Sequence, residues 1–557
     1  MIGVLSQESE SSAVREFFEL FKTPWEFWTP DKKYDLVIVT QERIPRQLNT
    51  NALVIYSSQK LESDNRIDVV RISPEKCSWV QWQGLEFPVY GHLAVFPTLT
   101  PRLAQRKGTS EAAVCALPES GYPTIRIGID LFYETAFLLS QGQSPENARV
   151  ATLDIHISLL RAIMMDLKVP FIEVPPVPPG YDFMACLTHD VDFVGIRDHK
   201  GDHTMWGFLY RSTIGSLLKS ISGRLSWSKC FRNWTAALSL PLVHLGLRPD
   251  FWLEFDRYME IEKDLGSTFF FIPFKDVSGT LEGVPAPRRR AAKYDIRRIK
   301  AQVLRLLKSS CEIGLHGIDA WQDSKNAWLE RMRLSEVTGQ AEAGVRMHWL
   351  YWNQSSAANL EGAGFTYDST FGYNNAIGFR AGTTQVFRFL DCKQMFELPL
   401  NIQDSAMFYS DRMMLSESEA LNACAELVRT TVSFGGVLTV NWHTRSLSPE
   451  RLWGDFYATL LEQIRAQRVW FGTAREVVEW FRNRRALRFE SVEFLEGGAR
   501  LELSGLTRDS ESFKFSVRVH DPILTPGELR SHTWNSSYHN AKEGDSLGDR
   551  EVLEVAY

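Results

Sequence analysis

The sequence has few cysteines and no paired cysteine motif. Its 557 residues include seven cysteines, an odd number, and no two of them stand in a Cys-x-x-Cys pair. A disulfide framework or a zinc ribbon is therefore not expected. Scattered thiols of this kind fit a reducing compartment, and we predict a cytoplasmic protein.

The sequence also lacks an excess of positive charge. Lys and Arg together number 62, Asp and Glu number 68, and the formal net charge is −6. Proteins that bind nucleic acids depend on a basic surface for affinity, so we expect no nucleic-acid partner.

Long apolar runs are missing as well. Residues 1–10 contain neither a basic segment nor a long apolar core, so no signal peptide is predicted. The most apolar later stretch, residues 236–247, contains Pro241 and is shorter than the about 20 apolar residues that span a bilayer. We therefore expect no membrane span.

What the chain does contain is enough apolar material, 44%, for two or three domains with their own cores. Residues 1–173 are predicted to form an N-terminal α/β domain, with strands at 34–40 and 52–56 and helices at 127–140 and 147–167. A proline-rich segment, residues 174–180, follows and is predicted to be an extended connector at a domain boundary.

Residues 181–485 alternate between strand-like and helix-like patterns, which predicts a parallel sheet or barrel wrapped by helices. The predicted strands are 183–188, 267–273, 312–316, 395–399 and 437–442, and the predicted helices include 294–308, 416–430 and 449–467. In such barrels the carboxyl ends of the strands form the active site.

Two further segments complete the predicted organisation. Residues 196–255, rich in Trp, Leu and basic residues, separate the first two strands by far more than an ordinary connection. We interpret them as a helical insertion packed on the barrel. The alternatives are a lid, a partner surface or an interfacial membrane contact. Residues 486–557 alternate like strands and predict a small β-sandwich followed by a polar tail of about 25 residues.

The most informative short run is 188–192, THDVD, at the end of a predicted strand. Asp190 and Asp192 are two residues apart and would point to the same side of the strand. Two carboxylates this close repel each other, and a divalent cation allows both to be ionised. One could then bind the metal while the other acts as a base. The alternative is a pair of solvated loop residues or helix caps.

Four later residues are candidates for the same site. His316 stands at the tip of an apolar strand, where it could bind a metal beside Asp192. Arg346 could lower the pKa of a catalytic carboxylate, or form a structural salt bridge. His443, at another strand end, is a candidate general acid, and Asp404 could orient its imidazole. Taken alone, each histidine is more often a structural residue, and Arg346 and Asp404 could equally be structural.

The order and spacing of these motifs resemble the polysaccharide deacetylase family, the NodB-homology domain. The resemblance covers about residues 181–485 and implies a distorted (β/α) barrel. It implies that Asp190 is the base, that Asp192 and His316 are metal ligands, that Arg346 positions the base and that His443 is the catalytic acid. Residues 397–404 stand where a further family motif falls. Residues 364–370 and 378–382 resemble the sequence of one branch of this family, whose members carry extra N-terminal sequence.

One position departs from the family pattern. The second motif usually carries another His four residues after the first, and here that residue is Ala320. Two protein ligands hold a divalent cation weakly. The missing ligand could be supplied by Asp319, by His348 or by water.

The resemblance implies a metal-dependent deacetylase, with zinc the expected metal, that hydrolyses N-acetyl groups of an amino-sugar glycan or its precursor. The alternatives are a degraded deacetylase-fold protein that binds glycan or scaffolds polysaccharide assembly, and an O-deacetylase that cleaves esters. Aromatic residues near the motifs could stack on sugar rings or belong to the core: Trp349, Tyr351, Trp352 and Trp442.

Overall fold

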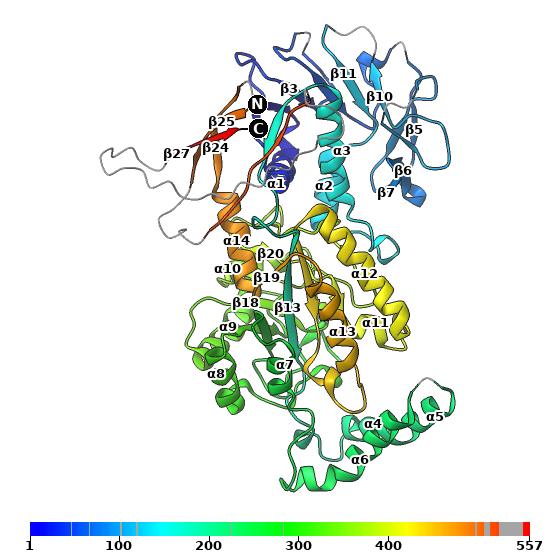
Figure 1. Cartoon of the computed structure of the whole chain (residues 1–557), viewed down its shortest axis with the longest axis vertical. Helices are drawn as coiled ribbons and strands as arrows, with labels where there is room; N and C mark the ends of the chain where they lie inside the picture. Colours follow the sequence, from blue (N-terminus) through cyan, green and yellow to red (C-terminus); the bar gives the residue numbers. More distant parts are fainter. Residues whose placement is uncertain are drawn as a thin grey trace, which may run out of the picture.

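The computed structural model describes every residue except 46, 66, 101–102, 118–120, 224, 282, 496–497, 506–512, 523–549 and 557. Figure 1 shows an N-terminal α/β part, a central sheet flanked by helices, and a helical arm at the far end of the molecule. The fold is a mixture of helices and largely parallel sheets.

The N-terminal part contains a six-stranded sheet, parallel except for its β10 edge strand. Its strands, in spatial order, are β10 (Val114–Leu117), β11 (Thr124–Ile127), β4 (Leu53–Tyr56), β3 (Leu36–Val39), β1 (Ile2–Leu5) and β2 (Trp25–Phe27). The accompanying helices are α1 (Ser11–Phe21), α2 (Leu131–Ser140) and α3 (Thr152–Asp166). Smaller antiparallel pairs involve β5 (Val70–Ile72), β6 (Ser78–Trp82), β7 (Leu85–Val89), β8 (Leu93–Val95) and β9 (Ala104–Arg106).

The central sheet is built around β13 (Phe183–Val191), whose nine residues are all buried. A strand that is buried along its whole length is typical of parallel sheets covered on both faces. The path of the sheet runs β20 (Phe396–Glu397), β19 (Tyr367–Asp368), β18 (Gly344–Met347), β17 (Glu312–Gly317), β14 (Ser267–Phe271), β13, β22 (Val437–Asn441) and β21 (Ile402–Gln403), with β23 (Val469–Phe471) also pairing with β13. All of these pairings are parallel.

The predicted parallel sheet wrapped by helices is confirmed, but the complete barrel is not. Among the described strands, the two ends of the path, β20 and β21, do not pair with each other, so the sheet is a curled half-barrel. Both end strands are only two residues long, which leaves few backbone groups to close a ring.

Several helices surround the sheet, and one of them, α12 (Glu417–Phe434), begins and ends at clear local signals. The helices are α7 (Phe255–Ile261), α8 (Lys300–Lys308), α9 (Ser324–Thr338), α10 (Ser356–Gly362), α11 (Asp404–Phe408), α12 (Glu417–Phe434), α13 (Gly454–Arg465) and α14 (Ala474–Ala486). Ser416 and Glu419 form a capping box at the start of α12, which ends at Gly435 with a φ of 80°. The helix predicted at 416–430 is therefore confirmed and extends one turn further.

The proline-rich segment that was predicted to be an extended connector is mostly buried. Residues 174–178 are buried, and the Arg484 guanidinium donates to the main-chain carbonyls of Val174, Glu19 and Leu20 at 2.6, 3.0 and 3.1 Å. One side chain of α14 thus links the segment to the end of α1. The segment is a packed part of the structure because a buried guanidinium satisfies its carbonyls.

Near the C-terminus, β24 (Arg488–Leu495), β25 (Gly498–Ser504) and β27 (Arg550–Ala556) form a three-stranded antiparallel sheet. The strand β26 (Arg518–His520) pairs instead with β12 (Phe171–Glu173), far away in the sequence. A second sheet facing the first is not seen in the described C-terminal residues, so the expected sandwich is not shown. Of the predicted polar tail, residues 550–556 form β27, and most of the rest lies outside the described residues.

Candidate metal site

The candidate residues gather at the carboxyl-terminal edge of the central sheet. Asp190 is the second-last residue of β13, and Asp192 lies just beyond the strand. His316 lies near the end of β17, Arg346 lies on β18, and His348 directly follows it. Asp404 directly follows β21, and His443 lies two residues beyond the end of β22. Because these strands are parallel, their carboxyl ends share one edge of the sheet.

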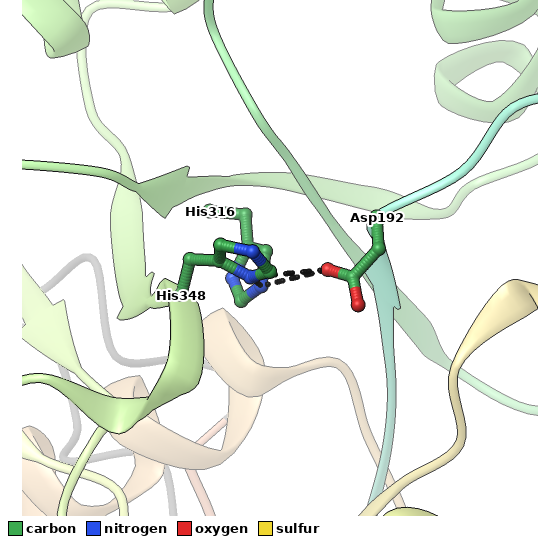
Figure 2. Close-up of side chains that lie close together, drawn as sticks. All are labelled: Asp192, His316 and His348. Atoms are coloured by element: carbon green, nitrogen blue, oxygen red, sulfur yellow. Dashed lines mark hydrogen bonds and ion pairs between the residues drawn. The ribbon is translucent and has the colours of Figure 1, made fainter. Parts of the chain in front are cut away.

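Three side chains from three strands converge at this edge. Figure 2 shows Asp192, His316 and His348 facing one another. The His316 Nε2 and His348 Nδ1 atoms lie 3.3 and 3.2 Å from the Asp192 Oδ1, and 2.9 Å from each other. Ligands about 2.1 Å from one metal ion lie about 3–3.5 Å apart, so the spacing fits a shared cation.

The tautomers of the two histidines support this interpretation. The His316 Nδ1 donates to the Arg346 carbonyl at 2.9 Å, and the His348 Nε2 donates to the Arg290 carbonyl at 3.1 Å. In the neutral rings, the two nitrogens that face each other then both carry lone pairs. Lone pairs at this distance repel each other unless a proton or a cation lies between them.

Asp192 supplies the negative charge. Its Oδ1 is buried and, within the described part of the chain, accepts no hydrogen bond. Burial alone would raise the pKa of Asp192, but the neighbouring His348 and His316 outweigh it and hold the pKa well below its ordinary value. Burial lowers the pKa of His348, which favours the neutral imidazole that metals bind. One carboxylate and two neutral imidazoles form a donor set that suits zinc.

His348, and not Asp319, supplies the third candidate ligand. The Asp319 Oδ1 accepts hydrogen bonds from the Thr280 main-chain N–H at 3.0 Å and from Gln322 Nε2 at 2.8 Å, away from the cluster. Ala320 is fully buried. The chain turns sharply after His348, with φ of 63° at Trp349, a conformation that non-glycine residues seldom adopt.

Arg290 holds His348 from both sides. Its carbonyl accepts from the His348 Nε2, and its own Nη2 donates to the carbonyls of His348 at 3.0 Å and Ile318 at 2.8 Å. The side chain is almost fully buried and lies 4.4 Å from the ring centre of Tyr351. Arg290 was not predicted as a site residue, because it lies in a short loop helix without a motif.

Asp190 is held as an ionised carboxylate next to the cluster. Arg346 Nη1 donates to its Oδ1 at 3.1 Å and Asn441 Nδ2 donates to its Oδ2 at 2.8 Å, while His316 Nε2 lies 3.8 Å from Oδ2. Burial alone would raise the pKa of Asp190, but His316 and Arg346 outweigh it and lower the pKa. Asn441 was not predicted as a site residue, although it stands two residues before His443.

Arg346 is itself fixed by several partners. Its Nη1 also donates to Thr188 Oγ1 at 2.7 Å, and its Nε and Nη2 donate to the carbonyl and hydroxyl of Ser369 at 3.0 and 2.9 Å. The guanidinium lies 4.6 Å from the ring centre of Phe270. A buried guanidinium with this many partners fixes the position of the carboxylate that it binds.

His443 approaches the same carboxylates from β22. Its Nε2 lies 3.8 Å from Asp192 Oδ2 and 4.0 Å from Asp190 Oδ2, and its Nδ1 lies 2.6 Å from Asp404 Oδ1. Burial alone would lower the pKa of His443, but the ion pair with Asp404 outweighs it and raises the pKa to about 10. Asp404 also accepts the main-chain N–H of His443 at 2.8 Å and the hydroxyl of Ser446.

The aromatic candidates divide into two groups. Trp442 is fully buried and stacks on Phe456 and Tyr457, with ring centres 5.7 and 5.0 Å away, so it belongs to the core and not to a sugar-binding surface. Three others are only partly buried beyond β18 and remain candidates for ligand contact: Trp349, Tyr351 and Trp352.

Comparisons with known proteins complete the description. No family model and no curated protein matches the chain. Among solved structures, a putative polysaccharide deacetylase from Mycobacterium smegmatis is similar at 17% identity and a TM-score of 0.33, over 56% of this chain and 95% of that one. PuuE allantoinase is similar at 12% identity and a TM-score of 0.33, over 55% and 92%. A probable polysaccharide deacetylase from Pseudomonas aeruginosa PAO1 is similar at 15% identity and a TM-score of 0.32, over 43% and 76%.

Proposed function

We propose that this chain is a metal-dependent hydrolase that removes N-acetyl groups from an amino-sugar glycan or a precursor of one. The observation that carries the proposal is the convergence of Asp192 Oδ1, His316 Nε2 and His348 Nδ1, with the other nitrogen of each ring bound to a main-chain carbonyl. These atoms would hold the cation, with zinc as the candidate. When bound, it would polarise the acetyl carbonyl and make a water molecule more acidic.

Asp190 is the proposed base. It would take a proton from the attacking water through Oδ2, the oxygen nearest the cluster, while Arg346 and Asn441 keep the carboxylate in place. Because both hydrogen bonds favour the ionised carboxylate, Asp190 is ready to accept a proton at neutral pH.

His443 is the proposed acid. Its Nε2 is the donor on the side of the cluster, because the Nδ1 is bound to Asp404. It would give a proton to the nitrogen that leaves as the C–N bond breaks, so that water and the amide become acetate and a free amine. Asp404 would stabilise the charged imidazole before this transfer.

Two variants test the proposal. Acetate release from N-acetylglucosamine oligomers and bound zinc should be measured on the intact chain. Asp190→Asn should abolish acetate release and keep the metal, because Asp190 is not in the ligand set. His316→Ala should lose both. Full metal-dependent activity in His316→Ala would show that the assignment is wrong.

The substrate class needs a separate comparison. The same residues would serve an ester hydrolase, so acetate release should also be measured from an O-acetylated polymer. A chain that binds zinc and oligosaccharide but releases no acetate from either substrate would instead be a binding protein with this fold.

A further inference from the structure

Residues 203–249 form a helical arm at one end of the molecule. It comprises α4 (His203–Tyr210), a π-helical turn (Arg211–Gly215), α5 (Ser216–Ile221) and α6 (Trp227–His244). In Figure 1 these helices lie at the opposite end of the molecule from the N-terminal sheet. The predicted helical insertion is therefore present, but much of its apolar surface is not packed on the barrel.

The outer face of α6 is apolar. Its residues recur at intervals of three and four and so lie on one side of the helix. This exposed or half-exposed row consists of Trp227, Phe231, Trp234, Leu238, Leu242 and Leu245. Leu238 is 82% exposed and Leu245 is 72% exposed. The opposite side of the same helix is the buried one, with Cys230, Ala237 and Leu240.

The preceding helices carry a second apolar row. It consists of exposed side chains at intervals of four, four, four and three: Trp206, Tyr210, Ile214, Leu218 and Ile221. The Trp234 indole donates to the Thr213 carbonyl at 3.2 Å, which brings the two helical segments into contact next to Ile214. Two adjacent helices thus leave large apolar side chains in solvent, which a monomeric protein rarely does without a binding partner.

The arm is strongly basic, which favours an anionic partner. Residues 203–249 contain six Lys and Arg and no Asp or Glu, a formal charge of +6 on a chain of −6, which leaves −12 for the remainder. Lys219, Arg232 and Arg248 are exposed. Apolar and aromatic side chains mixed with basic ones suit the interface of an anionic bilayer, where rings sit at the headgroups and cations meet lipid phosphates.

We propose that this arm binds to the surface of an anionic phospholipid bilayer. Within the described residues, no helix is both long enough and apolar enough to cross a membrane, so the binding is peripheral. A second copy of the chain fits this face less well, because two arms would bring the exposed Lys219, Arg232 and Arg248 of both copies together, and neither arm contains an Asp or Glu. The proposal does not depend on the proposed hydrolase activity.

The base of the arm adjoins the candidate metal site. Phe193, directly after Asp192, contacts Trp252 with ring centres 5.6 Å apart, and Arg445 lies 3.9 Å from the Trp252 ring centre. These residues join the arm to the carboxyl-terminal edge of the sheet. A bilayer bound by the arm would therefore lie on the same end of the molecule as that edge (Figure 1).

Vesicle flotation with the full chain tests the proposal. The chain should float with vesicles of phosphatidylcholine and phosphatidylglycerol and only weakly with phosphatidylcholine alone. The double variant Leu238→Glu/Leu245→Glu should bind at least about tenfold more weakly, because each carboxylate would enter the headgroup region. Arg232→Glu/Arg248→Glu should lose the preference for phosphatidylglycerol.

A matched control introduces two glutamates at exposed apolar positions outside the arm. Val284 and Met414 are 65% and 64% exposed outside the arm, so Val284→Glu/Met414→Glu should float like the unmodified chain. The proposal is overturned if the unmodified chain does not float with phosphatidylglycerol vesicles, or if the Leu238→Glu/Leu245→Glu variant floats equally well. It is also overturned if light scattering shows a dimer that this variant converts to a monomer, since a second copy would then cover the face.

Discussion

The imidazole of His443 is bound to Asp404, with 2.6 Å between Nδ1 and Oδ1, although the two residues follow different strands, β22 and β21. The same carboxylate accepts the His443 main-chain N–H. Asp404 therefore fixes both the ring and the backbone of the proposed acid. Its contribution to catalysis would act entirely through His443.

The first prediction concerns this pair. Asp404→Asn should lower kcat for acetate release roughly 10³- to 10⁴-fold, because an amide neither holds the imidazole tautomer nor stabilises its charge. Zinc content should not change. If Asp404 acts only through His443, the double variant Asp404→Asn/His443→Gln should be no slower than His443→Gln. A further drop in the double variant would contradict that role.

The second prediction separates the two residues that could replace the missing ligand. His348→Ala should lose most of the bound zinc, because only two protein ligands remain. Asp319→Asn should keep it, since Asp319 bonds to Thr280 and Gln322 and not to the cluster. Metal analysis after dialysis measures both. Equal retention by the two variants would remove His348 from the ligand set.

Much of the sheet could be predicted because its strands are short, mostly apolar runs, and the chemically informative residues stand at their carboxyl ends. The strand predicted at 183–188 is confirmed and continues to Val191, and the strands predicted at 312–316 and 437–442 are confirmed to within one residue. This placement brought Asp190, His316 and His443 to one edge. Periodicity and strand order were enough for that step.

What could not be predicted depends on contacts between distant segments. The Arg290 side chain and its carbonyl reach His348 only after a loop folds back over the sheet, and no local pattern signals this. The buried state of the proline-rich segment likewise depends on Arg484, 310 residues away from Val174. Asn441 could have been found from its spacing to His443, since alternate residues of a strand share a face.

The third prediction concerns two buried acids outside the proposed mechanism. Asp368 and Glu397 are register partners on β19 and β20, are fully buried, and leave Oδ2 and Oε2 without a hydrogen bond within the described residues. Burial raises the pKa of Asp368 to about 7, and burial together with Asp368 raises the pKa of Glu397 well above its ordinary value. The fold therefore favours their protonated forms.

The stability that these protons provide is complete below the ordinary pKa of about 4 and is lost as the pH rises through 7. Glu397→Gln keeps this side chain uncharged at every pH and provides an amide that can donate to Asp368. Its free energy of unfolding at pH 8 should exceed that of the unmodified chain by about 1–3 kcal/mol, with a smaller gain at pH 5. Urea unfolding at both pH values measures this, and an equal loss of stability at both would contradict it.

The fourth prediction concerns acid sensitivity and His156, a buried residue of α3. The ring packs edge-on against Phe87, with ring centres 5.1 Å apart, and neither ring nitrogen has a hydrogen-bond partner within the described residues. Burial lowers the pKa of His156 from 6.5 to about 4. Between these values the unfolded chain takes up a proton that the folded chain does not, so stability is complete above about pH 6.5 and falls as the pH drops toward 4.

His156→Met cannot be protonated and should recover up to about 2 kcal/mol of the stability lost between pH 7.5 and pH 5. Thermal unfolding at the two pH values measures this difference, and His203→Gln, which changes an exposed histidine, serves as the control. An unchanged difference in the His156→Met variant would mean that another group causes the loss in acid.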